Sequence, residues 1–331
     1  MASDVKLLVE GLATEFTGDD GTVRVVDGVN LELRAGATLG LVGESGCGKR
    51  VTALSIMGLL PKPAGRVAAG RVVLDGRDLI ALPPEAMHTI RGRRISMVFQ
   101  EPMTALNPVH RVGEQLAETL RLHTDVGRGE ARGRAVELLA EVGIPAPERR
   151  FDEYPHQLSG GMRQRVLIAI ALACSPDVLI ADEPTTAVDV TIQAQILELI
   201  DRLQAQRGMS VIFITHDLGV IAEIADEVAV MYCGKVVERA SVDVLFSRPL
   251  HPYTRALLES MPRLQRRSKT RLPTIQGMVP SPRSLPKGCR FANRCSFATP
   301  ECGVEPPLAE VAAGHWVACH HWRRLAEDGV G

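Results

Sequence analysis

A glycine-rich loop that ends in lysine occupies residues 43–49 and reads Gly43-Glu44-Ser45-Gly46-Cys47-Gly48-Lys49. Small residues let successive backbone N–H groups surround phosphate oxygens, and the terminal lysine neutralises the outer phosphates. The apolar stretch Thr38 to Val42 precedes the loop, and the helix-like stretch Val51 to Leu60 follows it. Strand, loop and helix therefore come in the order that nucleotide binding requires. For the motif in isolation, the alternative is a glycine-rich turn before a helix.

Two acids follow a second apolar stretch. Val178 to Ala181 is typical of a buried strand, and Asp182 and Glu183 come directly after it. A carboxylate at this position can orient Mg²⁺ through water, and its neighbour can polarise an attacking water molecule. The pair therefore predicts a magnesium residue, Asp182, and a catalytic residue, Glu183.

Two further polar residues end predicted strands. Gln100 follows the strand 95–99, and His216 follows the strand 211–215. The carboxyl ends of parallel strands meet at one sheet edge, so both polar side chains should lie at that edge. Packing as a satisfied core residue is the alternative for each.

The segment Leu158-Ser159-Gly160-Gly161-Met162-Arg163-Gln164 stands upstream of the two acids. With the phosphate loop, it resembles the signature of ABC transporter nucleotide-binding domains. The resemblance implies that its serine and two glycines, at a helix N-terminus, contact the γ-phosphate of ATP held by the opposite subunit. Hydrolysis would then require a dimer.

The same resemblance assigns roles to residues outside the signature. It makes Gln100 a sensor of magnesium and of the membrane partner, Asp189 a residue that crosses the dimer, and His216 a switch near the γ-phosphate. Phe16 stands where the family carries an aromatic residue that stacks on adenine, with core packing as its alternative. The predicted nucleotide-binding set is Phe16, Gly43, Glu44, Ser45, Gly46, Cys47, Gly48, Lys49, Arg50, Val51, Ser159, Gly160, Gly161, Asp182 and Asp189.

Position 50 departs from the family pattern. Arg50 stands where the family has Ser or Thr, whose hydroxyl binds magnesium. Thr52 cannot simply replace it, because residues two apart on a helix point to different sides. Arg50 could instead pair with phosphate or with Asp182. We therefore expect a site that binds ATP and hydrolyses it poorly; an altered sequence is the other explanation.

The end of the chain carries a second resemblance. His251-Pro252-Tyr253-Thr254-Arg255-Ala256-Leu257-Leu258 and the later stretch Gly288 to Cys295 resemble the extension of dipeptide and oligopeptide permease ATPases. Cys289, Cys295, Cys302 and Cys319 lack the paired C-x-x-C spacing that usually holds structural zinc. The family resemblance implies a [4Fe–4S] cluster at these cysteines. Zinc and simple packing remain alternatives, with His315, His320 and His321 as rival ligands.

The remaining sequence predicts the elements that position these residues. Alternating strands and helices predict an α/β fold with a parallel sheet, and short β-rich runs near the start predict an antiparallel layer. Residues 111–142 have a helical pattern. We expect a P-loop ABC ATPase core with a mixed sheet over residues 1–245, with a helical subdomain inserted at about 103–165. A small irregular cysteine-bearing extension would occupy residues 246–331.

Composition limits the class of function. The 331-residue chain has a formal net charge of −1, which gives no global attraction to nucleic acid. The start lacks a signal peptide, and no apolar run is long enough to span a membrane, so we expect the chain to stay in the cytoplasm and not to span the bilayer itself. The resemblance to permease ATPases implies a peripheral place on the cytoplasmic face of the membrane.

The family resemblance implies an ATPase that imports di- or oligopeptides. Its expected partners are two permease subunits, a second identical or homologous ATP-binding subunit and, indirectly, an external substrate-binding protein. No nucleic-acid partner is expected. A soluble ABC ATPase acting on nucleic acid is the rival hypothesis, and a redox-sensing tail is a third.

Overall fold

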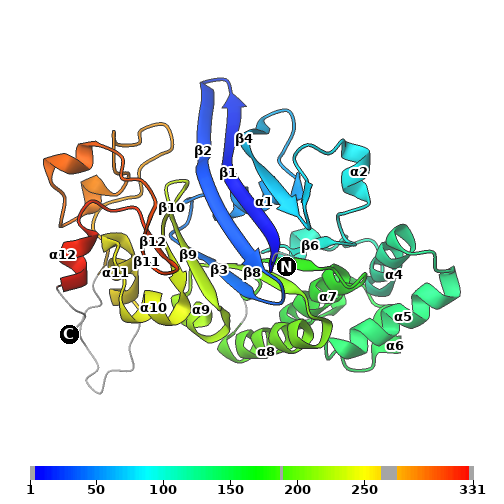
Figure 1. Cartoon of the computed structure of the whole chain (residues 1–331). Coiled ribbons are helices and arrows are strands. Elements are labelled where there is room, and N and C mark those ends of the chain that lie inside the picture. Colours follow the sequence, from blue (N-terminus) through cyan, green and yellow to red (C-terminus); the bar gives the residue numbers. More distant parts are fainter. Residues whose placement is uncertain (1–3, 187–188, 262–273, 328–331) are drawn as a thin grey trace, which may run out of the picture. The chain divides into compact units, whose positions relative to one another are not determined.

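The computed structural model describes residues 4–186, 189–261 and 274–327 (Figure 1). The chain forms two compact units. Unit 1 comprises Met1–Lys6, Leu33–Ala37 and Ala81–Ile212, and unit 2 comprises Leu7–Glu32, Thr38–Ile80 and Phe213–Gly331.

Unit 1 is built on two buried parallel strands. β6 (Ile95–Val98) pairs with β7 (Val178–Asp182) in a register that places Val98 opposite Ala181. Every residue of both strands is buried, as expected for strands covered on both faces. The strands therefore end close together; Glu183 directly follows β7, and Gln100 follows β6 after Phe99.

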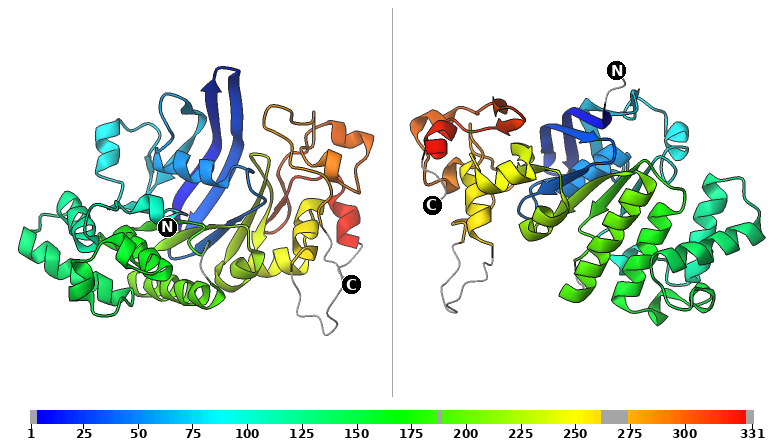
Figure 2. Two further views of the ribbon diagram at one scale, coloured as in Figure 1. Left: turned by 180° about the vertical axis from the view of Figure 1, so that it is seen from behind. Right: turned by 60° about the horizontal axis from the view of Figure 1, so that its bottom comes forward.

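The helices of unit 1 include the predicted helical region. Residues 111–142 form two helices, α4 (Val112–His123) and α5 (Arg128–Glu141), which lie beside α7 (Gly160–Leu172) (Figure 2). On α4 the buried residues Val112, Leu116 and Leu120 recur every fourth position, which gives one apolar face. The other helices of the unit are α2 (Pro84–His88), α3 (Pro102–Ala105), α6 (Pro147–Phe151), η1 (Pro155–Gln157) and α8 (Val190–Arg207).

Unit 2 contains the predicted antiparallel layer. Its strands are β1 (Val5–Gly18), β2 (Gly21–Arg34), β4 (Gly65–Leu74) and β5 (Arg77–Asp78), in the order β2-β1-β4-β5 (Figure 1). β2 is one continuous strand of 14 residues, longer than the short β-rich runs expected from the sequence. Gly28 lies inside it with φ 70°, so a glycine in the left-handed region interrupts the pattern without ending the strand.

The strand that leads into the phosphate loop belongs to a second sheet of unit 2. β3 (Thr38–Val42) is parallel to β9 (Glu227–Tyr232), and β9 forms an antiparallel pair with β10 (Lys235–Ser241). The C-terminal extension continues this sheet: β12 (His315–Val317) pairs with β10, and β11 (Ala309–Ala312) pairs with β12. The extension, expected to be irregular, is therefore joined to the core by backbone hydrogen bonds.

The remaining elements complete the two units. β8 (Ser210–Thr215) begins in unit 1 and ends in unit 2. Unit 2 also holds α1 (Lys49–Met57), α9 (Leu218–Ile224), α10 (Val242–Ser247), α11 (Pro252–Glu259), η2 (Ala292–Arg294), η3 (Pro300–Gly303) and α12 (Trp322–Glu327). Among the described residues, none of these helices combines the length and apolar character of a membrane span.

Candidate functional site

The side chain of Lys49 binds backbone carbonyl oxygens of the phosphate loop itself. Lys49, 6% exposed, donates from Nζ to the carbonyl oxygens of Gly43 at 2.6 Å and Glu44 at 3.3 Å. Gly43 has φ 148°, and a Cβ there would lie 2.2 Å from the Met231 carbonyl oxygen. Only glycine fits this position. Ser45 and Gly46 are exposed at the tip of the loop, whereas Cys47 and Gly48 are buried.

Helix α1 starts at the loop and places Arg50 in its first turn. Arg50 is exposed, and Val51 behind it is half-buried. Thr52 is fully buried and donates from Oγ1 to the Gly48 carbonyl at 3.0 Å. Its hydroxyl is thus engaged with the helix backbone, in agreement with the expectation that Thr52 does not replace a hydroxyl at position 50.

Phe16 lies near the end of β1, half-buried. A Cβ on Gly65 of β4 would come within 2.9 Å of its Cε1 atom, so the ring packs closely against a strand without a side chain. The ring is held by the antiparallel layer and keeps part of its surface exposed, which suits stacking on a flat base.

The acids of unit 1 stand at the end of β7. Asp182 is 2% exposed. Glu183 follows with φ 47°, a left-handed conformation that is uncommon outside glycine and that turns the chain at this point. The Glu183 carboxylate accepts hydrogen bonds from Gln100 Nε2 at 2.9 Å and from Thr186 Oγ1 at 2.8 Å. Thr186 is a contact that the sequence motifs did not indicate.

The signature segment forms the N-terminus of α7. Ser159 is the exposed N-cap residue, and its side chain accepts a hydrogen bond from the Met162 N–H at 3.3 Å. Gly160 has no neighbour within 4 Å of an added Cβ, whereas a Cβ on Gly161 would lie 2.9 Å from Ile192 Cγ2. The helix begins at Gly160, directly after the capping serine, so the signature residues stand at a helix N-terminus as expected.

The last two motif residues also adjoin helix starts. Asp189 is the N-cap of α8 and accepts from the Ile192 N–H at 2.9 Å. His216 is exposed after β8, and its neighbour Asp217 caps α9 by accepting from Gly219 N–H at 2.8 Å. Phe16, the phosphate loop and His216 belong to unit 2, and the other motif residues belong to unit 1.

The four C-terminal cysteines lie near one another in unit 2. Burial raises the pKa of Cys319 to about 12, and Coulomb interactions with the other three thiols contribute in the same direction. The backbone N–H groups of Phe297 and His321 donate to the sulfur atoms of Cys295 and Cys319, at 3.4 and 3.3 Å. In the part of the chain that the structure describes, no three His, Cys, Asp or Glu side chains are close enough to hold a metal ion.

The rival histidine ligands make other contacts. His315 Nε2 is 2.8 Å from Glu238 Oε1, and both side chains are buried. His320 Nε2 contacts the Val304 carbonyl at 3.0 Å. His321 Nε2 lies 3.7 Å from Cys302 Sγ and 2.9 Å from Thr299 Oγ1. His321 therefore contacts one of the four thiols, that of Cys302.

Two residues of the C-terminal extension reach the phosphate loop, and the sequence motifs did not assign them this role. Tyr253 Oη accepts a hydrogen bond from the Glu44 N–H at 2.8 Å. Arg294 binds both Glu44 carboxylate oxygens through its two terminal nitrogens, at 2.6 and 3.0 Å. The signal available in the sequence was their position, inside the His-Pro-Tyr phrase and one residue before Cys295.

Comparison with known proteins identifies two segments. Residues 26–186 match the family described as ABC transporter, and residues 237–302 match the family described as oligopeptide/dipeptide transporter, C-terminal region. Among solved structures, a dimeric ATP-binding cassette in a post-hydrolysis state, bound to ADP and Pi, has a TM-score of 0.64. It is 28% identical, and the match covers 71% of this chain and 98% of that chain. The α/β cassette fold is confirmed.

Curated relatives match nearly the whole chain. A probable peptide ABC transporter ATP-binding protein of Sinorhizobium fredii is 54% identical, covering 97% of this chain and 96% of the relative. The oligopeptide transport ATP-binding protein OppD of Bacillus subtilis is 51% identical, covering 94% of this chain and 87% of the relative. The chain therefore belongs to the family of peptide and oligopeptide ABC transporter ATP-binding proteins.

Proposed function

We propose that this chain is the ATPase subunit of an importer of di- or oligopeptides, and that it converts ATP binding and hydrolysis into movement of separate membrane permeases. The match of residues 237–302 to the oligopeptide/dipeptide transporter C-terminal region carries the peptide assignment. An ATP-binding core alone would not distinguish the transported solute, because substrate contacts lie in other subunits. The names of the relatives from Sinorhizobium and Bacillus support the same assignment.

The rival hypothesis, an ABC ATPase acting on nucleic acid, receives no support from the comparisons. Co-purification of the tagged chain with two membrane proteins is the expected result. Salt-sensitive DNA binding by the purified chain, without such partners, would favour the rival.

In the proposed nucleotide site each motif has its own chemical role. Lys49 and the N–H groups of residues 45–48 would hold the phosphates, and the ring of Phe16 would stack on adenine. Asp182 would orient Mg²⁺, which supplies charge neutralisation at the phosphates. Glu183, whose carboxylate is already held by two donors, would polarise the attacking water.

The remaining motif residues are proposed to act across a dimer. Ser159, Gly160 and Gly161 would present the N-terminus of α7 to the γ-phosphate bound by the opposite subunit. Asp189 would contact that subunit, and Gln100 and His216 would sense the γ-phosphate and signal its presence. The exposure of Ser159 and Gly160 supports this role, since a surface that meets a partner must be accessible.

Arg50 decides how well this site hydrolyses ATP. We infer that Arg50 leaves ATP binding intact and slows hydrolysis, because the hydroxyl that would bind magnesium is missing and Thr52 donates its own to Gly48. The test is Mg·ATP hydrolysis by the assembled transporter. We expect Arg50→Ser to raise kcat about tenfold and to change the ATP dissociation constant little.

The matched control is Glu183→Gln, which should abolish turnover in both backgrounds. If the unaltered chain turns over as fast as Arg50→Ser and Glu183→Gln stops it, arginine is tolerated beside the metal and the inference about Arg50 is wrong. If no variant binds ATP, the proposed function itself fails.

We further propose that Cys289, Cys295, Cys302 and Cys319 hold a [4Fe–4S] cluster, with zinc as the alternative metal. The residue types support this, because four thiols lie in one part of unit 2 and two of the sulfur atoms accept backbone N–H bonds. Among the described residues the side chains are not close enough to hold a metal as they stand, so the cysteines would have to move together on binding it. Thiolates that bind iron are commonly stabilised by such N–H donors.

The test is elemental analysis of anaerobically purified protein. Iron and acid-labile sulfide in equal amounts support the cluster, zinc without sulfide favours the alternative, and neither metal indicates packing. Cys302→Ser should abolish metal content, whereas Cys174→Ser, outside the extension, should retain it.

The proposed assembly has two ATP-binding subunits, identical or homologous, and two permease subunits, with an external substrate-binding protein delivering the peptide. The chain would lie peripherally on the cytoplasmic face of the membrane. We propose a nucleotide-binding domain over residues 1–245, with its helical subdomain at about 103–165, and the extension over residues 246–331. Separation of membranes with and without the permeases tests the location: the chain should sediment only with membranes that contain the permeases.

A further inference from the structure

A residue of the C-terminal extension binds the carboxylate of Glu44, in the phosphate loop. Arg294 forms two parallel hydrogen bonds with it, and the Arg294 side chain is only 5% exposed. The paired geometry is the strongest arrangement between arginine and carboxylate. Hydrogen bonding to Glu44 raises the pKa of Arg294 above its ordinary value, so this guanidinium stays charged.

Arg294 is fixed on its other sides as well. Its Nε donates to the Gln276 carbonyl at 3.0 Å, and Nη1 lies 3.3 Å from Tyr232 Oη. The guanidinium carbon is 5.8 Å from the centre of the Tyr232 ring and 6.0 Å from that of Phe291. A buried guanidinium with this many contacts has little freedom to move. Its position therefore determines the position of the Glu44 carboxylate.

The backbone of Glu44 is held by the same extension. Its N–H donates to Oη of Tyr253, a fully buried residue of α11. Its carbonyl oxygen accepts from Lys49 at 3.3 Å. The extension therefore determines both the side-chain and backbone position of the residue next to the phosphate-binding N–H groups.

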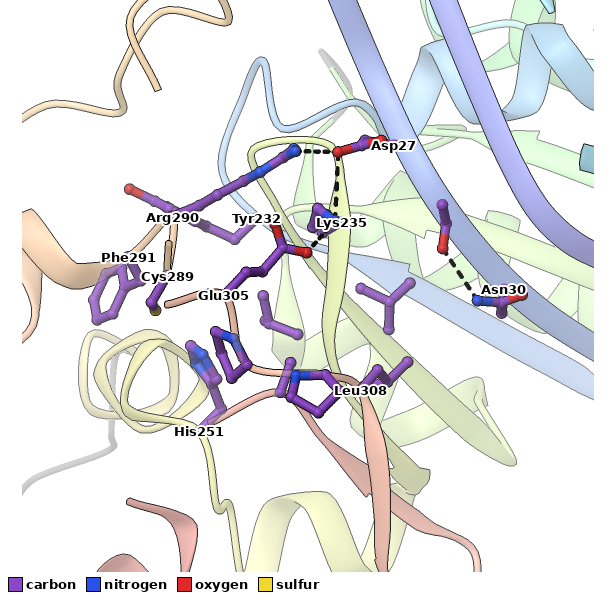
Figure 3. Close-up of a pocket in the computed structure, with 16 residues that line it drawn as sticks. Asp27, Asn30, Tyr232, Lys235, His251, Cys289, Arg290, Phe291, Glu305 and Leu308 are labelled. Carbon is purple, nitrogen blue, oxygen red and sulfur yellow. Dashed lines mark hydrogen bonds and ion pairs between the residues drawn. The ribbon is translucent and has the colours of Figure 1, made fainter. Parts of the chain in front are cut away.

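The segment of the extension that carries Arg294 makes a second connection toward the phosphate loop, through Arg290 near its other end. Arg290 pairs with Asp27 and donates to the Cys233 carbonyl, beside a cavity of about 220 Å³ where Lys235 bridges Asp27 and Glu305 (Figure 3). The next residue, Gly234, donates from its N–H to the Cys47 carbonyl at 2.8 Å.

Arg290 and Arg294 are each adjacent to a clustered cysteine. Arg290 follows Cys289, and Arg294 precedes Cys295. A change in the cysteine cluster would move both arginines directly, because the chain between them is one short segment that ends in the helix η2.

We propose that Arg294 is a positioning residue for the phosphate loop, which couples the state of the cysteine-bearing extension to nucleotide affinity. This rests on the proposed binding of ATP at that loop. Loss of the arginine fork releases Glu44 and disorders the adjacent N–H groups, so the loop must be ordered again each time nucleotide binds.

The test measures the ATP dissociation constant of the full chain by a fluorescent ATP analogue, with thermal unfolding as the folding check. We expect Arg294→Ala and Glu44→Gln each to weaken affinity about tenfold. Arg294→Lys, which keeps the charge without the fork, should fall between them and the unaltered chain. The double variant Arg294→Ala/Glu44→Gln should lose no more than either single variant, because both remove the same contact.

Arg283→Ala is the matched control. Arg283 lies in the same extension, and its guanidinium contacts Asp20 rather than the phosphate loop, so its loss should leave nucleotide affinity unchanged. Replacement of Cys295 by serine should weaken affinity in the unaltered chain and have no further effect in the Arg294→Ala background.

The outcomes separate the two claims. Undetectable ATP binding by the unaltered chain would mean that the proposed function fails. Normal affinity in folded Glu44→Gln, or additive losses in the double variant, would overturn the positioning role alone. Glu44 is partly exposed, so Glu44→Gln provides this answer even if Arg294→Ala does not fold.

Discussion

Gln100 donates a 2.9 Å hydrogen bond from Nε2 to the carboxylate of Glu183, although the two residues are 83 positions apart in the chain. The parallel pairing of β6 with β7 creates this contact, since it brings the carboxyl ends of the strands together. The residue proposed to sense the γ-phosphate is thus bonded to the residue proposed to activate water. Any displacement of Gln100 must change the orientation of that carboxylate.

The first prediction concerns this bond. Gln100→Ala removes one of the hydrogen bonds that orient the Glu183 carboxylate, so the carboxylate should be held less firmly for its role toward water. We expect kcat for Mg·ATP hydrolysis to fall about tenfold or more, with a smaller change in ATP affinity.

Steady-state hydrolysis and equilibrium ATP binding measure the two quantities separately. Gln206→Ala, an exposed glutamine-to-alanine change near the end of α8, is the control and should leave both unchanged. A Gln100→Ala enzyme with normal kcat would show that the bond has no part in hydrolysis.

The local conformation of the phosphate loop could be predicted from the sequence, because it depends on a short motif. A glycine-lysine loop between a strand and a helix can form only where its glycines fit, and Gly43 at φ 148° meets this condition. The apolar run before Asp182 predicted a buried strand, and this strand predicted the position of Glu183 at its carboxyl end. These predictions needed only residues close together in the chain.

Contacts between distant segments could not be predicted in the same way. Arg294 and Glu44 are 250 residues apart, and Tyr253 and Glu44 are 209 apart. Arginine next to cysteine carries no pattern that names a glutamate as its partner. The pairing of β12 with β10 was also hidden, since a three-residue strand is too short for alternation to appear.

The second prediction compares two glycines on helices of unit 1. Gly133 on α5 is exposed and has open space around an added Cβ, so Gly133→Ala should stabilise the protein by about 0.5–1 kcal/mol. Gly113 on α4 faces the ring of buried Phe151, with an added Cβ 2.0 Å from Cδ2. Gly113→Ala should therefore destabilise by about 3 kcal/mol.

Urea unfolding of both variants tests the comparison. The gain in helix propensity is smaller for Gly113, the second residue of α4, than for Gly133 inside α5. It is at most about 1 kcal/mol at either position, so most of the expected difference between the variants comes from the steric conflict with Phe151. Equal stabilities would mean that the ring moves away without cost, contrary to the packing described.

The last prediction concerns pH. His251 is buried, and its Nδ1 accepts the Tyr253 N–H at 3.1 Å, so the neutral ring caps α11. Burial lowers the pKa of His251 from 6.5 to about 4. Between these values the unfolded chain binds a proton that the folded chain does not, so folding stability falls as pH falls from 6.5 toward 4.

This difference corresponds to about 3 kcal/mol across the whole window, of which about 2 kcal/mol should be lost by pH 5. His251→Asn keeps an acceptor for the capped N–H and removes the titrating ring. Urea unfolding at pH 7.5 and pH 5 should therefore show a smaller loss of stability for the variant than for the unaltered chain. If both lose the same amount, protonation of His251 does not contribute to acid destabilisation, and the buried ring must be accommodated in its charged form by the neighbouring Glu238, whose charge acts to raise its pKa.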